Sequence, residues 1–169
     1  MDTLTSPAYQ IISHHLFAER RQKCSNQQNA LFAIRPFLPG DVIADFSAGT
    51  ISAVPTYLTV QVGVDKHITL QPEFLQYINH SCSPNVFFNT TTMQLVALKS
   101  IKPEEEMTFF YPSTEWKMTQ TFSCYCGSPV CIGEIKGAAF LSKEVQAKYR
   151  FTDFIQQQLA IQPARQKVA

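Results

Sequence analysis

Three cysteines, Cys124, Cys126 and Cys131, fall within a stretch of eight residues toward the end of this chain. The spacing C-x-C-x4-C is too compact for ordinary core packing, and it lets three thiolates converge on one tetrahedral ion. A structural Zn²⁺ site usually has four ligands, so this run predicts a fourth ligand from a distant part of the chain. The best candidate is Cys82, with Cys24 or a histidine as alternatives. Such a metal site would clip the C-terminal segment onto a remote loop.

Composition is that of one globular domain, with 169 residues of which 45% are apolar. The net charge of +1 gives no reason to expect nucleic acid or a membrane surface as a partner. The longest apolar runs are far shorter than the ~20 residues that span a bilayer. The first residues do not resemble a signal peptide, so we expect a reducing, intracellular compartment, cytoplasmic or nuclear. Thiols there bind metal more often than they pair, and Cys24 is interpreted as a bystander.

Short runs rich in Val, Ile, Thr and Phe, separated by Pro, Gly and Asn, predict a β-rich domain of many short strands up to about Tyr111. The predicted strands are 31–34, 42–46, 58–62, 67–70, 85–88, 94–98 and 107–109. Residues 1–25 carry no clear pattern and receive no assignment.

The chain also contains a short internal repeat. Ala33-Ile34-Arg35 is followed by Pro39, Asp41 and Ile43, and Ala97-Leu98-Lys99 is followed at the same spacing by Pro103, Glu105 and Met107. We refer to residues 33–43 and 97–107 as the repeat segments. Each is predicted to form a strand, a turn and a strand.

The chain after Cys131 changes to a helical pattern. Ser142 is a candidate N-cap, and Val145, Tyr149, Ile155 and Leu159 recur at the spacing of an amphipathic helix. We expect one helix from Ser142 to about Leu159, packed on the domain and ending before Pro163. The remaining residues, 162–169, are expected to fray.

Three motifs resemble those of SET-domain protein lysine methyltransferases. The stretch 77–85, Tyr-Ile-Asn-His-Ser-Cys-Ser-Pro-Asn, resembles the pseudoknot motif of that family, and 106–111, Glu-Met-Thr-Phe-Phe-Tyr, resembles its second signature. The run from Cys124 to Cys131, followed by Gly133, resembles the post-SET zinc segment. All three occur in the order expected for the family.

The resemblance implies a mainly β SET fold, in which short sheets surround a pseudoknot, with a post-SET zinc segment and a C-terminal helix. It divides the chain into a lead segment (1–25), the SET domain (26–121), the post-SET segment (122–137) and a helical extension (138–169). The strand ending at Tyr111 should pass beside Asn79 and His80. The methyl donor would be S-adenosylmethionine, and the acceptor a lysine of a protein or peptide, of which a histone is one option.

The resemblance also implies roles for single residues. Zinc would be held by Cys82, Cys124, Cys126 and Cys131. The donor would be bound by Asn29, Ala30, Leu31, Asn79, His80 and Tyr125, with His80 acting mainly through its backbone and Tyr125 either covering the adenine or facing solvent. The substrate channel would be lined by Phe46, Phe109 and Phe110, and the catalytic residue would be Tyr111.

The chemistry of methyl transfer fits an aromatic channel. A free lysine has a pKa near ~10.4, and its protonated amine cannot attack the donor. A narrow apolar channel lowers that pKa and excludes water. Ring faces stabilise the cationic donor and product, and the Tyr111 hydroxyl orients the amine. This scheme requires no general base.

Two departures from the family pattern concern the donor site and the lysine channel, respectively. The usual Gly-x-Gly is replaced by Gln28-Asn29-Ala30, and the usual Glu-Tyr by Asp45-Phe46. Asn29 is the residue expected to tolerate an unusual backbone conformation in place of glycine. The departures motivate an alternative, a catalytically weak or inactive SET-like module that binds a peptide or partner. A zinc-stabilised structural module is a third possibility.

Overall fold

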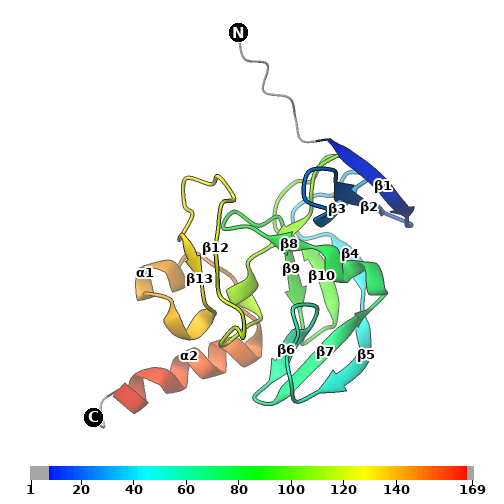
Figure 1. Cartoon of the computed structure of the whole chain (residues 1–169). Coiled ribbons are helices and arrows are strands. Elements are labelled where there is room, and N and C mark those ends of the chain that lie inside the picture. The colour runs from blue at the N-terminus through cyan, green and yellow to red at the C-terminus, as the bar shows by residue number, and fades with distance from the viewer. Residues whose placement is uncertain (1–7, 167–169) are drawn as a thin grey trace.

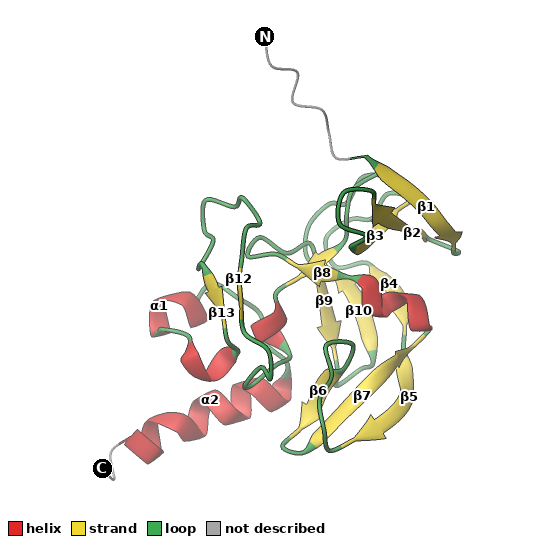
Figure 2. Cartoon of the chain, in the orientation of Figure 1, coloured by secondary structure: helices red, strands yellow, loops and turns green. Residues whose placement is uncertain are grey.

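The computed structural model describes residues 8–166, and its architecture is mainly β, as the sequence predicted (Figures 1 and 2). Three antiparallel three-stranded sheets carry most of the domain. Their strand orders are β1-β2-β3, β4-β10-β9 and β5-β7-β6. The strands are β1 (Tyr9–His14), β2 (Ala18–Lys23), β3 (Asn29–Ala33), β4 (Val42–Asp45), β5 (Ser47–Ser52), β6 (Val60–Gly63), β7 (Lys66–Gln71), β9 (Val86–Asn89) and β10 (Gln94–Ala97).

Smaller elements complete the chain. Parallel strands β8 and β11 pair, as do antiparallel β12 and β13. The described residues include no helix long and apolar enough to cross a membrane. The remaining elements are η1 (Glu73–Tyr77), β8 (Asn79–His80), β11 (Thr108–Phe109), η2 (Tyr111–Ser113), β12 (Phe122–Ser123), β13 (Glu134–Ile135), η3 (Ala138–Phe140), α1 (Lys143–Gln146) and α2 (Asp153–Gln166), where η marks a 3-10 helix.

All seven predicted strand segments overlap a strand of the structure. The prediction missed β5 and the short strands β8, β12 and β13, and it also missed β1 and β2, which lie in the segment left without assignment. Strand β2 has the sequence AERRQK, and two of its charged side chains, Glu19 and Arg21, form ion pairs. The Arg21 guanidinium contacts Glu19 at 2.8 Å and also pairs with Glu104. Because polar side chains of β2 are paired with other residues, the strand lacks the alternation of apolar and polar residues from which strands are predicted.

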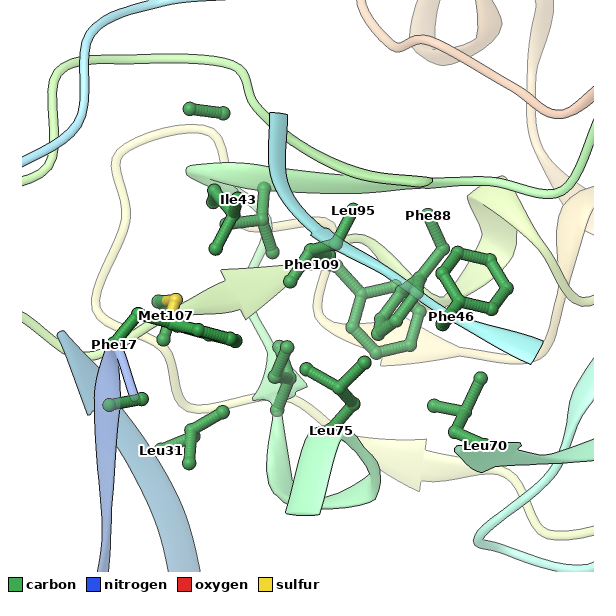
Figure 3. Packing of buried hydrophobic residues seen from close by; sticks show 14 of the residues in the cluster. Phe17, Leu31, Ile43, Phe46, Leu70, Leu75, Phe88, Leu95, Met107 and Phe109 are labelled. Carbon is green, nitrogen blue, oxygen red and sulfur yellow. The ribbon is translucent and has the colours of Figure 1, made fainter. Parts of the chain in front are cut away.

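The main hydrophobic core lies where the three sheets meet (Figure 3). Phe46, Phe88 and Phe109 come from three different parts of the chain and pack edge to face. The ring centroids are 5.5 Å apart for Phe46 and Phe88, and 4.9 Å apart for Phe88 and Phe109. This aromatic group anchors β11, the strand that leads directly to Tyr111.

The two repeat segments pair with each other. The Ala33 N–H donates to the Glu105 carbonyl at 2.9 Å, and at the equivalent position the Ala97 N–H donates to the Asp41 carbonyl at 2.9 Å. The reciprocal bonds are also equivalent, since the Gly40 N–H donates to Ala97 and the Glu104 N–H donates to Ala33, each at 2.8 Å. The pairing therefore has a local two-fold symmetry.

The same symmetry extends to the backbone conformation of the turns. Gly40 has a φ of 90°, and its equivalent, Glu104, has a φ of 74°. A left-handed conformation is ordinary for glycine and uncommon for glutamate. The Glu104 side chain pairs with Arg21 of β2, so this turn also holds the N-terminal sheet.

The predicted single C-terminal helix is wrong in its continuity and in its end. Ser142 caps α1 as expected, because its hydroxyl accepts from the Val145 N–H at 3.3 Å. The helix nevertheless stops at Gln146, and α2 begins at Asp153 and continues through Pro163 to Gln166, so part of the expected frayed tail is helical. Residues 167–169 lie outside the described part.

The break between the helices has a packing cause. Tyr149 stacks on Phe110, with ring centroids 3.7 Å apart, and Phe151 is buried in the same cluster. Both side chains face the domain at a spacing of two residues, which suits an extended chain rather than a helix. The Thr152 N–H donates to Ser113 at 3.0 Å, and the Thr152 hydroxyl caps α2 by accepting from Ile155. This second hydrophobic cluster packs against the cysteines of residues 122–137, and its buried members are Cys82, Phe110, Ile135, Ala138, Phe151 and Ile155.

Candidate active site and metal cluster

Four cysteines meet at the boundary between the sheets and the C-terminal segments. Their sulfur atoms, from Cys82, Cys124, Cys126 and Cys131, all lie within 4.8 Å of one another. The Sγ atoms of Cys82 and Cys124 are 4.0 Å apart. Sulfurs around a tetrahedral Zn²⁺ are about 3.8 Å apart, given a Zn–S distance of ~2.3 Å. The arrangement therefore fits a tetrahedral ion, and Cys82 rather than Cys24 joins the compact run.

The chemistry of the four thiols also fits a cation. Cys82 is buried, and burial together with the neighbouring sulfurs raises the pKa of its thiol. Burial likewise raises the pKa of Cys124 to about 11. Four thiolates cannot coexist at this distance without a positive charge between them. All four cysteines are free of disulfide bonds.

Hydrogen bonds connect the cysteine cluster to both flanking segments. The Cys124 N–H donates to Gly133 at 2.6 Å, next to the β12–β13 pairing. The Tyr149 hydroxyl donates to the Cys82 carbonyl at 2.6 Å. Tyr149 thereby links the α1–α2 connection to the loop that carries Cys82.

His80 connects the cysteine cluster to Tyr111 through its side chain. The ring Nδ1 accepts from the Tyr111 N–H at 3.1 Å, so the proton of the neutral ring lies on Nε2, which is 3.4 Å from the Cys82 sulfur. Burial lowers the pKa of His80 to about 4, which keeps the ring neutral. The expectation of a role mainly through the backbone therefore changes, because this side chain fixes the start of η2.

The predicted donor-binding residues Asn29 and Asn79 are in direct contact. The Asn79 side-chain amide donates to the Asn29 carbonyl at 2.7 Å and to Glu106 at 3.1 Å. Ala30 and Leu31 follow in β3, with side chains buried in the sheet, so only their backbone is available to a ligand. The unusual backbone conformation expected at Asn29 lies instead at Gln27, with a φ of 58°.

A cavity of about 580 Å³ opens beside Tyr111. Its walls come from the loop before β6, from η1, from β11 and from the segment between η2 and β12. Most of the lining is apolar, and Phe109 and Tyr111 form part of it, with ring centroids 4.7 Å apart. Asn79 and His80 are not among the lining residues, whereas Tyr111 both lines the cavity and contacts the His80 ring, with ring centroids 5.2 Å apart.

Electrostatics at Tyr111 keep its hydroxyl protonated. Burial raises the pKa of Tyr111 to about 12, with smaller effects from the carboxylates of Glu115 and Glu106. At neutral pH the group is therefore a neutral donor and acceptor of hydrogen bonds. Such a group can orient an amine without being a base.

Two of the three predicted channel residues, Phe110 and Phe46, do not line this cavity, and Tyr125 does not line it either. Phe110 faces the opposite side of β11 from Phe109 and Tyr111, because side chains alternate along an extended chain, and it stacks on Tyr149. Phe46 is buried against Phe88 in the core. Tyr125 is 92% exposed and covers nothing among the described residues.

Two residues of the site were not predicted from the sequence. Phe122 of β12 lines the cavity, and its ring centroid lies 5.7 Å from His80 and 5.9 Å from Tyr111. Its position two residues before Cys124 was the available signal, since the metal run fixes whatever precedes it. Glu115 also lines the cavity, and no local pattern distinguishes it.

Comparison with known proteins shows which family this sequence matches. The family model of the SET domain matches residues 7–112, which is more than half of the chain. The methyltransferase flvH of Aspergillus flavus is 39% identical over 107 residues, which cover 62% of this chain and 60% of that protein.

Two fungal enzymes named histone-lysine N-methyltransferase, H3 lysine-36 specific, are also similar. The one from Saccharomyces cerevisiae is 32% identical over 87 residues, covering 48% of this chain and 12% of that protein. The one from Candida albicans is 31% identical over 98 residues, covering 54% of this chain and 11% of that protein. The match thus spans less than two thirds of each of these three relatives.

Proposed function

This chain belongs to the SET-domain family, and we propose that it transfers a methyl group from S-adenosylmethionine to the side-chain amine of a protein lysine. The observation that carries the proposal is the position of Tyr111. It lines the apolar cavity and also contacts His80, the neighbour of Asn79, whose side-chain amide binds the Asn29 carbonyl. A donor beside Asn79 and an amine in the cavity would meet at its hydroxyl.

The chain's own residues provide positioning and exclusion of water. When bound, S-adenosylmethionine supplies an electrophilic methyl group, and we assign its binding to Asn79, His80 and the backbone of 29–31. The aromatic walls around Phe109 favour the neutral amine over the ammonium ion, because desolvation lowers its pKa. The Tyr111 hydroxyl, held by the His80 bond to the Tyr111 N–H, orients the amine nitrogen.

We assign a structural zinc ion to Cys82, Cys124, Cys126 and Cys131. Zinc at this position would neutralise the thiolates and hold β12, with Phe122, over Tyr111 and His80. The same four thiols must stay reduced to bind metal, so an intracellular compartment remains our expectation.

The relatives support a protein substrate. Two of them carry histone-lysine methyltransferase names, which makes a histone one candidate for this chain. A second candidate function, a SET-like module that binds a peptide without catalysis, is favoured by one observation. The usual glycine pair is absent, and β3 with buried Ala30 and Leu31 takes its place.

Donor binding distinguishes the two functions. We expect titration calorimetry of zinc-replete protein with S-adenosylmethionine to show binding at micromolar concentration, and no binding at high micromolar donor would exclude the enzyme. Tritiated S-adenosylmethionine should then label a peptide of a lysine-peptide array or a protein of a cell extract. Tyr111→Phe should lose this label, whereas Tyr9→Phe, a matched change at a half-buried ring in β1, should retain it. Equal labelling by both variants would contradict the assignment of Tyr111.

A further inference from the structure

Glu115 is the acidic residue of the cavity wall. Among the described residues that line the cavity, the other charged side chain is Lys117, which is exposed. Glu115 lies one turn after Tyr111, and its N–H donates to the Tyr111 carbonyl at 3.0 Å. The carboxylate and the tyrosine hydroxyl therefore belong to one short, rigid segment.

The carboxylate is held by one of its two oxygens. Oε1 accepts from the Gln61 N–H at 3.0 Å and from the Thr114 hydroxyl at 3.1 Å. Gln61 is itself fixed, since its side-chain oxygen accepts from the Trp116 N–H at 2.9 Å and its amide donates to Gly63 at 3.0 Å. Oε2 makes no hydrogen bond within the described part of the chain.

This arrangement is unnecessary for the fold alone. A glutamine at the same position could accept both bonds through its amide oxygen and would carry no charge into an apolar wall. An ionised carboxylate without a cation is costly in such surroundings. Burial accordingly raises the pKa of Glu115 to about 7. Lys117 lines the same cavity, but among the described residues Glu115 has no ion pair, and together with the free oxygen this points to a positively charged ligand.

We propose that Glu115 binds the ammonium group of the substrate through Oε2 and accepts its proton, so that the neutral amine reaches the Tyr111 hydroxyl. This inference rests on the proposed function. In the step, one N–H bond of the ammonium group breaks and an O–H bond forms on Oε2. The nitrogen lone pair then forms the bond to the donor's methyl group while the methyl–sulfur bond breaks, so the donor leaves as a neutral thioether and the product is a methylated ammonium ion. Glu115 afterwards releases its proton to water at the Lys117 edge.

The energetics of this proton transfer are reasonable inside the cavity. A lysine amine in water has a pKa near ~10.4, well above that of a carboxylate. The apolar walls lower the first value and raise the second, so the two groups approach each other. A proton acceptor works best when its pKa lies near the working pH.

The surrounding titratable groups leave Glu115 as the one that changes charge near neutrality. Tyr111 is the nearest on its own segment, and the raised pKa keeps its hydroxyl neutral. Lys117 and Tyr57 line the same cavity. His67 of β7 is the cross-strand partner of Gln61, and burial lowers the pKa of this histidine.

The test compares Glu115→Gln with wild type and with Glu144→Gln, a change at an exposed carboxylate in α1. Donor affinity is first measured by calorimetry. Initial rates of tritium transfer to the best labelled lysine peptide are then measured from pH 6 to pH 9. We expect the wild-type kcat/KM to rise about tenfold between pH 6 and pH 8, as a group with a pKa near ~7 ionises.

Glu115→Gln should bind the donor with wild-type affinity, lose about 100-fold or more in kcat/KM at pH 8, and lose the rise with pH. Glu144→Gln should match wild type throughout. If Glu115→Gln keeps the wild-type rate and pH profile, the inference is wrong while the proposed function stands. If wild type binds no donor or labels no peptide, the proposed function fails, and the inference fails with it.

Discussion

Gly137 is the last residue of the segment 122–137, and it lies where this segment crosses the chain at Trp116 and Lys117. Its φ is 115°, and a Cβ at this position would lie 2.5 Å from the Trp116 carbonyl oxygen and 2.9 Å from the carbonyl carbon. The contacting atoms are backbone, so they cannot rotate away. Around this crossing, the Ala138 N–H donates to Glu115 at 2.9 Å, and the Met118 N–H donates to Lys136 at 2.9 Å. A methyl group here must push the two segments apart.

We expect Gly137→Ala to lower the free energy of unfolding by about 3 kcal/mol. Left-handed backbone strain accounts for ~1–2 kcal/mol, and the loss of two hydrogen bonds for ~1 kcal/mol each. Denaturant titration of zinc-replete protein, followed by fluorescence of Trp116, measures this directly, since Trp116 is the one tryptophan of the chain.

Gly40→Ala is the matched control. Gly40 has a φ of 90°, but a Cβ there would meet nothing within 4 Å, so we expect a loss of only ~1 kcal/mol. If Gly137→Ala costs no more than Gly40→Ala, the steric argument is refuted, and the crossing of the two segments is looser than the distances indicate.

Three further changes test the metal cluster and the buried carboxylate. Cys82→Ser should reduce the zinc content, measured by atomic absorption, as much as Cys124→Ser does, and unchanged binding would place the fourth ligand elsewhere. Tyr149→Phe should cost about 1 kcal/mol in denaturant titration, because it removes the bond to the Cys82 carbonyl but keeps the ring stacking. Glu115→Gln should raise the free energy of unfolding at pH 8.5 and leave it unchanged near pH 4. The pKa of this carboxyl is higher in the folded than in the unfolded state, so the stability of the wild type falls as pH rises from ~4.5 to ~7. Because Glu115 is partly exposed, the stability gained by the variant at pH 8.5 is about 3 kcal/mol at most. Equal stabilities of variant and wild type at pH 8.5 would contradict the raised pKa.

The features predicted best were those with a fixed count or a local spacing. A tetrahedral ion needs four ligands, and that count led to Cys82 before its distance from Cys124 was known. Ser142 was identified as a cap because the cap, the first turn and their bond lie within four residues. The repeat segments were found from matching spacing, although the sequence did not show that they pair with each other.

The features that were missed depend on partners distant in sequence. Arg21, which stabilises β2, forms one of its ion pairs with Glu104, a residue 83 positions later in the sequence. Phe110 was assigned to the channel with its neighbours, although alternation along the strand turns it toward Tyr149. Glu115 is held by the backbone of Gln61, a contact that no local pattern indicates.

The symmetric pairing of the repeat segments has a consequence for how the protein is made. Residues 33–43 bond to residues 97–107 through Ala33, Phe37 and Asp41, and they leave the ribosome long before those partners exist. The sheet formed by β5, β6 and β7 joins strands close in sequence and can form earlier. The main core therefore closes late in synthesis, and until then its apolar strands are exposed and prone to aggregate.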